Sequence, residues 1–262
     1  MHQFLGYLGS FPIRSYSIIF ALAVLLGLGV TITLGKLQKK DELVKHLWNL
    51  FIPMMIGAII GSRFWHVFLF NWNYYSQHPS EILAVWQGGL SIQGGIVGAI
   101  IVAIWYVRKH QISFWELADL CTPGLILAQS IGRDANLMNG DAFGDPTGGD
   151  FGILYPEGTI ARETFGNQPL WPAEIWEGQM DVIIFAILLI LMQKKLRPGY
   201  LFLIYNVLYN IGRFALEMLR GDSPQFLFGW TAAQWTSVSV IFISLVIAGF
   251  LHFTYDKRNQ IT

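Results

Sequence analysis

The chain has 262 residues, of which 53% are hydrophobic and only 13% are charged, and its 17 basic and 17 acidic residues give a formal net charge of zero. A soluble globular domain carries about 25% charged residues, and nucleic-acid-binding proteins are usually basic, so the composition excludes an ordinary soluble domain and offers no case for nucleic-acid binding. The single cysteine, Cys121, excludes an internal disulfide and any cysteine-based metal cluster, and no metal or organic cofactor is implied.

Apolar stretches of about 20 residues recur along the chain, long enough to cross a hydrocarbon core of roughly 30 Å as helices. The first of them lacks a small-residue cleavage site and is interpreted as a retained span rather than a signal peptide. The sequence therefore predicts an all-α integral membrane protein, a seven-span helical bundle that forms one polytopic domain over residues 1–262. The predicted spans are residues 16–35, 47–70, 89–107, 114–131, 175–193, 200–219 and 231–253.

The basic residues orient this bundle. Eleven of the 17 basic residues, including every lysine, fall in alternate connections and in the C-terminal tail: Lys36, Lys39, Lys40, Lys45, Arg108, Lys109, Lys194, Lys195, Arg197, Lys257 and Arg258. Cytoplasmic loops are enriched in Lys and Arg, so these connections are expected to be cytoplasmic, with the N-terminus outside and the C-terminus inside. The long polar connection at residues 132–174, between spans four and five, is then predicted to form a small extracytoplasmic cap.

Several polar side chains lie in the outer half of the predicted bundle. Arg63 and Arg213 sit about six or seven residues below the outer ends of their spans, or on the order of 10 Å deep, with Gln93 at a similar depth. Arg133 and Tyr16 lie near the outer ends of theirs. An arginine near the bilayer centre costs at least about 2.5–3.5 kcal/mol, so this cluster needs an explanation.

Two explanations are open. Arg213, Glu217 and Arg220 are spaced by four and three residues, so they could form an internal ion-pair network along one helix face. Alternatively, the guanidinium forks of Arg133 and Arg213 could bind an anion such as a lipid phosphate of the outer leaflet. A clustered excess of arginine over buried acid favours the anion site, to which Asn136, Asn139 and Gly140 would add amide donors and a tight turn.

The glycine-rich segment at residues 87–98 opens the third span. Small residues there could let two helices approach closely, or could leave room for a lipid headgroup, and the sequence does not separate these uses. It lacks the Gly-Lys-Ser/Thr ending of a phosphate-binding loop of the Walker type.

Several segments carry a resemblance to a known family. Residues 132–144 read GRDANLMNGDAFG, residues 12–16 read PIRSY, residues 81–91 read EILAVWQGGLS and residues 209–220 read YNIGRFALEMLR. Taken in chain order, they resemble the motifs of the prolipoprotein diacylglyceryl transferases, and residues 132–144 are close to G-R-x-x-N-F-x-N-x-E-x-x-G. Within it, Leu137 replaces the usual aromatic residue and Asp141 stands where Glu is common.

The chain departs from the family pattern at two histidines. Gln93-Gly94-Gly95 stands where relatives usually have a histidine before the glycines, and residues 171–177, WPAEIWE, replace a motif close to H-P-x-Q-L-Y-E. His66, one helical turn from Arg63, is the one membrane-embedded histidine that could substitute, although a histidine hydrogen-bonded within the bundle is the commoner arrangement.

The resemblance implies a multi-pass enzyme of the bacterial cytoplasmic membrane. It would transfer the diacylglyceryl group of phosphatidylglycerol to the lipobox cysteine of a preprolipoprotein signal peptide, forming a thioether and releasing glycerol 1-phosphate. It also implies two residue sets. The catalytic set is Arg133, Arg213, Tyr16, Gln93, Glu217 and Asp141, and the phosphatidylglycerol-binding set is Arg133, Asn136, Asn139, Gly144, Arg213 and Arg220.

Two alternatives remain at this stage. The replaced histidines are compatible with a paralogue on the same scaffold that is inactive or accepts another acceptor or lipid. An anion transporter would also bury arginines, but it predicts internal repeats with interrupted helices in matching halves, and the sequence has none.

Overall fold

The computed structural model describes residues 1, 3–9 and 11–261, without the side chains of residues 8, 11 and 256–261, so Lys257 and Arg258 lie outside the described side chains. The chain is mostly helical. In order, its elements are β1 (Phe4–Leu8), β2 (Phe11–Arg14), α1 (Ser15–Leu37), α2 (Asp41–Trp65), η1 (His66–Phe70), α3 (Trp72–Tyr75), η2 (Pro79–Glu81), η3 (Val85–Gln87), α4 (Ile92–His110), α5 (Phe114–Asn139), α6 (Ile160–Phe165), α7 (Ala173–Met192), α8 (Tyr200–Glu217), η4 (Leu227–Gly229) and α9 (Ala232–Ile261).

Five of the described helices are long and apolar enough to cross a membrane, in agreement with an all-α membrane protein: α1, α2 extended by η1, α4, α7, and α9 up to Tyr255. Helices α5 and α8 also coincide with predicted spans but are not among the five. One element was not anticipated, an antiparallel hairpin of β1 and β2 that leads directly into α1.

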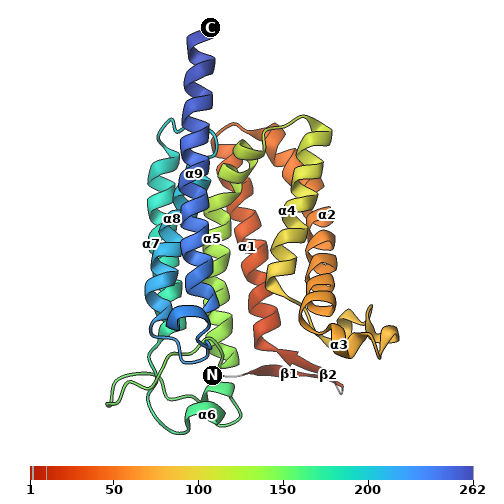
Figure 1. Cartoon of the computed structure of the whole chain (residues 1–262), viewed down its shortest axis with the longest axis vertical. Coiled ribbons are helices and arrows are strands. Elements are labelled where there is room, and N and C mark those ends of the chain that lie inside the picture. Colours follow the sequence, from red (N-terminus) through yellow and green to blue (C-terminus); the bar gives the residue numbers. More distant parts are fainter. Residues whose placement is uncertain (2, 10, 262) are drawn as a thin grey trace. The chain divides into compact units, whose positions relative to one another are not determined.

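The elements form two compact units. The first comprises Met1–Leu34 and Ala118–Thr262, and the second comprises Gly35–Leu117. In the first unit, α8 packs against both α7 and α9, and Figure 1 shows the β hairpin and α6 at the end of this unit opposite the C-terminal end of α9. Buried apolar residues of α5, α7 and α8 make its core: Ile126, Ile184, Leu188, Leu201 and Tyr205.

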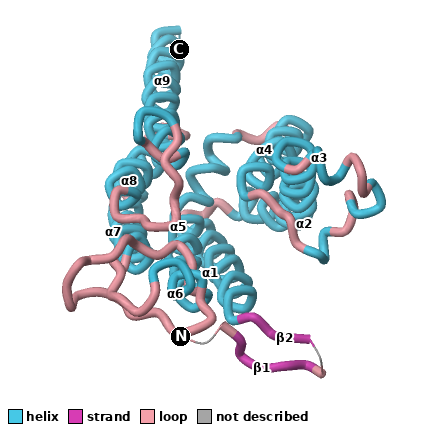
Figure 2. Tube along the Cα trace, turned by 60° about the horizontal axis from the view of Figure 1, so that its bottom comes forward, coloured by secondary structure: helices cyan, strands magenta, loops and turns pink. Residues whose placement is uncertain are grey.

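The connection between α5 and α7 is a folded segment of its own. It contains α6 and a small buried cluster of Phe143, Tyr155, Ala161 and Leu170, and Figure 2 shows its loops gathered around α6. The segment starts at about residue 140, later than predicted, because α5 does not end at residue 131 but continues to Asn139. Arg133 in this extension is tolerated because it has a buried carboxylate partner on α7.

In the second unit, α2 and α4 approach through glycines. A Cβ atom on Gly61 would lie 2.3 Å from the Gly94 carbonyl oxygen, and one on Gly98 would lie 2.2 Å from the Gly57 carbonyl oxygen. Neither distance leaves room for a side chain. Close helix packing therefore explains Gly94 and Gly98 of the glycine-rich segment.

This packing predicts that Gly61→Ala destabilises the protein by about 1–3 kcal/mol, because the added methyl group must displace the backbone of α4. Thermal unfolding of the purified protein measures the effect. Gly29→Ala on α1 is the matched control, since no described atom outside the local backbone of its own helix lies within 4 Å of the Cβ position there. Equal melting temperatures for the two variants would contradict the close approach.

Candidate active site

Helices α5, α7 and α8 bring two arginines onto one buried carboxylate. Glu177 of α7 is fully buried. Its Oε1 accepts hydrogen bonds from Arg133 Nη2 of α5 at 2.6 Å and from the Tyr209 hydroxyl of α8 at 3.1 Å, and its Oε2 accepts one from Arg213 Nη1 of α8 at 2.9 Å. Glu177 therefore bridges Arg133 and Arg213, which keep 20% and 15% of their side-chain surfaces exposed.

The same pattern continues along α8. Arg213 Nη2 forms an ion pair with Glu217 Oε2 at 2.7 Å, and Arg220 Nε lies 4.0 Å from that same oxygen. Arg220 also donates from Nε and Nη2 to the two carboxylate oxygens of Asp222, at 2.7 and 2.6 Å. Positive and negative groups alternate from Arg133 through Glu177, Arg213, Glu217 and Arg220 to Asp222, and we call these six residues the arginine–carboxylate chain.

The prediction that arginines outnumber the buried acidic residues in this cluster is wrong. Besides Glu177 and Glu217, Glu174 and Asp181 are buried on α7, both with 0% exposure. Neither carboxylate oxygen of Asp181 has a hydrogen-bond partner among the described residues. The spacing of 174, 177 and 181 places three acids on one face of an apolar helix. The predicted site omits Glu177, and this spacing is the sequence pattern that could have indicated it.

Tyr155 secures Glu174 from the folded segment between α5 and α7. Its hydroxyl donates a hydrogen bond to Glu174 Oε1. Burial and the adjacent Glu174 carboxylate raise the pKa of the Tyr155 hydroxyl, so it remains a donor at neutral pH. This contact ties the small core around Phe143 to the first turn of α7, three residues before Glu177 of the arginine–carboxylate chain.

Asp141 is held by the two asparagines of the G-R-x-x-N-x-x-N segment. Asn136 Nδ2 and Asn139 Nδ2 each donate to one oxygen of Asp141, both at 2.7 Å, around a turn at Gly140 with φ +74°. The amide donors that were expected to face an anion are thus bonded to a carboxylate of the chain itself. Tyr16, at the start of α1, lies near enough to Asp141 and Arg133 to interact electrostatically with both.

Gly144 serves a close backbone approach. Its N–H donates to the Trp171 carbonyl oxygen at 3.1 Å, and it forms an isolated bridge with Arg220. A Cβ atom there would lie 2.4 Å from the Trp171 carbonyl oxygen. The glycine therefore lets its own segment pass closely between Trp171, just before α7, and Leu219, just after α8.

Gln93, Arg63 and His66 belong to the second unit. Ser91 caps the N-terminus of α4, and its hydroxyl donates to Gln93 Oε1 at 2.7 Å. Arg63 donates four hydrogen bonds to backbone carbonyls, those of Glu81, Ile82, Gly88 and Gly89, at 2.6–3.0 Å. Arg63 therefore holds the loop before α4 and is not part of the arginine–carboxylate chain.

His66 has local partners in the same unit. Asn71 Nδ2 lies 3.2 Å from its Nε2, and its ring packs edge-on against Tyr75. A Cβ atom on Gly89 would come within 2.7 Å of both His66 Nε2 and Arg63 Nη1, so this glycine covers the two side chains.

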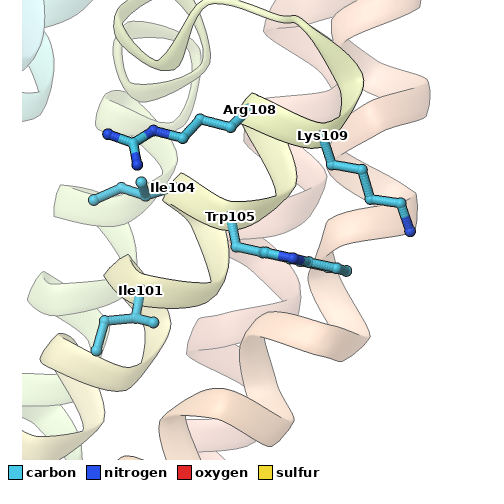
Figure 3. A pocket seen from close by; sticks show the side chains of 5 residues that line it. All are labelled: Ile101, Ile104, Trp105, Arg108 and Lys109. Carbon is cyan, nitrogen blue, oxygen red and sulfur yellow. The ribbon is translucent and has the colours of Figure 1, made fainter.

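A recess of about 560 Å³ runs along α4, lined by Ile101, Ile104, Trp105, Arg108 and Lys109. Figure 3 shows Arg108 and Lys109 extending in opposite directions from the helix, with Lys109 over the Trp105 ring at 4.9 Å. The recess begins eight residues beyond Gln93, roughly 12 Å along the helix, so it is separate from the candidate site residues of α4.

Comparisons with known proteins identify the family. A family model described as prolipoprotein diacylglyceryl transferase matches residues 3–250. Proteins named phosphatidylglycerol–prolipoprotein diacylglyceryl transferase from Acaryochloris marina, Nostoc sp. and Listeria innocua are 38%, 36% and 35% identical to this chain. These matches cover 82%, 82% and 96% of this chain, and 78%, 77% and 89% of the respective relatives. The chain therefore belongs to the prolipoprotein diacylglyceryl transferase family.

Proposed function

We propose that this protein transfers the diacylglyceryl group of phosphatidylglycerol to the lipobox cysteine thiol of a preprolipoprotein, forming a thioether and releasing glycerol 1-phosphate. The observation that carries the proposal is the convergence of Arg133 and Arg213 on Glu177. Both arginines are paired with Glu177 but keep 20% and 15% of their side-chain surfaces exposed, and guanidinium groups are suited to binding phosphate oxygens. The names of the relatives supply the two substrates.

The proposed placement in the bacterial cytoplasmic membrane has seven spans, with the N-terminus outside and the C-terminus in the cytoplasm. Helices at all seven predicted positions support it, with α5 and α8 as the two polar spans. The folded segment around α6 is then an extracytoplasmic cap, and the whole chain is one polytopic domain. Phosphatidylglycerol would enter from the outer leaflet, and the signal peptide would present its cysteine at the same level.

In the proposed reaction the cysteine thiolate attacks the glyceryl carbon that carries the phosphate ester. The carbon–oxygen bond breaks, the electron pair leaves with the phosphate oxygen, and glycerol 1-phosphate departs. Arg133 and Arg213 stabilise the negative charge that grows on that oxygen, because preorganised cations act strongly in a site with little water. The thiol proton passes to a base of the protein, for which Asp141, Glu217, Tyr16 and His66 are the candidates.

Complementation tests the function. A bacterial strain depleted of its own transferase would express this protein, and mass spectrometry of a model lipoprotein would detect the thioether-linked diacylglyceryl group. Growth together with the modification supports the proposal. A protein that accumulates in the membrane but yields no modification would instead point to the inactive or redirected paralogue. Anion flux without lipidation would indicate the transporter.

The family motif that the sequence resembles has a histidine at the place of Gln93, and we expect Gln93→His to retain or increase the rate of transfer. A positioned base contributes about 10²–10⁴-fold in rate, and glutamine cannot accept a proton. Transfer rates of purified wild-type and variant proteins on a lipobox peptide measure the effect. A complete loss of activity with normal folding would mean that the site has been rebuilt around glutamine.

A further inference from the structure

The N-terminus of α9 is closed by a reciprocal pair of hydrogen bonds. Gln234 N–H donates to Thr231 Oγ1 at 3.3 Å, and Thr231 N–H donates to Gln234 Oε1 at 3.0 Å. This is a capping box, in which two otherwise unpaired backbone donors of the helix end are satisfied by side chains. Both residues are buried, with 8% and 6% exposure. The side chain of Thr231 is therefore fixed in one orientation.

The fixed hydroxyl has a second partner outside α9. A hydroxyl group has one proton, and here Thr231 Oγ1 already accepts from the backbone of its own helix. Its proton is donated to Glu217 Oε1 of α8 at 2.8 Å. The other oxygen of Glu217 forms the 2.7 Å ion pair with Arg213. A hydrogen bond and an ion pair thus connect Thr231, at the end of α9, through Glu217 to Arg213, an arginine of the proposed phosphate site.

The chain just before Thr231 strengthens this anchor. Thr231 forms an isolated bridge with Gln225, and the Phe226 N–H donates to the Trp230 carbonyl oxygen at 2.7 Å. The loop that these contacts close begins at Gln225, three residues after Asp222, which pairs with Arg220. Both ends of the loop between α8 and α9 are therefore attached to the arginine–carboxylate chain.

We propose that Thr231 is a positioning residue of the phosphate site: its hydroxyl holds the Glu217 carboxylate, and Glu217 holds Arg213 in the orientation that receives the phosphodiester of phosphatidylglycerol. The inference rests on the proposed function. Thr231 touches no substrate, and its effect reaches the lipid only through Glu217. A buried ion pair depends on good geometry and on satisfaction of its remaining lone pairs, which is what the hydroxyl provides.

Four variants separate this role from simple capping of α9. Thr231→Ser keeps both the cap and the proton donor. Thr231→Val keeps the shape and loses the hydroxyl. Thr231→Asp keeps a strong cap, because Asp is among the best N-cap residues, but it cannot donate to Glu217 and places a like charge beside it. Thr236→Val is the matched control, since the exposed Thr236 hydroxyl donates to the Ala232 carbonyl oxygen of its own helix and has no other partner among the described residues.

The readouts are KM for phosphatidylglycerol in mixed micelles and the inhibition constant of glycerol 1-phosphate, which occupies the phosphate site without turnover. For Thr231→Val we expect both constants to rise by about 10-fold, because a hydrogen bond to a charged group is lost. For Thr231→Asp we expect at least the same rise. Thr231→Ser and Thr236→Val should stay within about twofold of wild type.

Two outcomes would overturn the inference. If Thr231→Asp has wild-type constants, the hydroxyl serves only as the cap of α9. If Thr231→Val changes melting temperature but neither constant, its role is structural. Should Thr231→Val not fold, the comparison of Thr231→Asp with Thr231→Ser decides the question alone. Absence of transfer by the wild-type protein would refute the proposed function instead, and it is observed before any variant is made.

Discussion

Arg133→Ala and Arg213→Ala are each expected to reduce thioether formation by about 10³-fold or more. Each replacement removes one of the two cations that share Glu177. In the proposed reaction it also removes a donor to the phosphate oxygen on which negative charge develops. Loss of a single preorganised donor costs about 10²–10³-fold in other enzymes, and a full charge in a buried site is worth more than a neutral donor. Transfer from labelled phosphatidylglycerol to a lipobox peptide measures the loss.

Controls separate chemistry from folding in this experiment. Removing one member of a buried ion pair can cost about 3–5 kcal/mol, so thermal unfolding must accompany each activity measurement. Arg133→Lys and Arg213→Lys keep the charge but lose the planar fork, and we expect partial activity from them. Arg162→Ala in α6 is the matched control, because its Nη1 bonds only to the Asn167 side chain within its own segment. Near-wild-type lipidation by either alanine variant would end the phosphate-site hypothesis.

The helices and half of the arginine–carboxylate chain could be predicted from the sequence. Apolar stretches of span length locate the long helices. The spacing of Arg213, Glu217 and Arg220 by four and three residues predicts contacts between them at the end of α8. Glu177 could not be assigned in this way. Its partners stand 44 residues earlier on α5 and 36 residues later on α8, and a single sequence does not say which faces of three helices meet.

The turn after α5 shows the same limit at short range. Its asparagines and Asp141 were recognised as site residues, but the sequence does not tell whether the amides face a ligand or a neighbouring carboxylate. In the structure both amides donate hydrogen bonds to the neighbouring carboxylate of Asp141. Likewise, the glycine-rich segment allowed both helix packing and room for a headgroup, and the steric contacts of Gly94 and Gly98 with α2 select packing for these two positions.

Glu177→Gln is expected to lower kcat by about 100-fold while leaving KM for phosphatidylglycerol unchanged or lower. The carboxylate pairs with the guanidinium groups that the proposed mechanism assigns to the phosphodiester, so its neutralisation would remove a competitor for them. It also removes the shared anchor that holds Arg133 and Arg213 at a fixed separation, and misplacement of catalytic groups by about 1 Å can cost about 10²-fold. Steady-state kinetics with varied lipid at saturating peptide measure both constants.

The direction of KM distinguishes alignment from binding in this variant. Gln retains the volume of Glu, and its single oxygen can still accept hydrogen bonds from Arg133 and Tyr209. Its amide nitrogen is a donor and cannot accept from Arg213, so the change removes the charge together with one arginine contact. Glu163→Gln in α6 is the matched control, because that carboxylate is exposed and outside the arginine–carboxylate chain. If KM rises about 100-fold at constant kcat, Glu177 contributes to lipid affinity and does not act by aligning the arginines. A fall in kcat alone means that the buried carboxylate sets the geometry in which the two cations meet the departing phosphate.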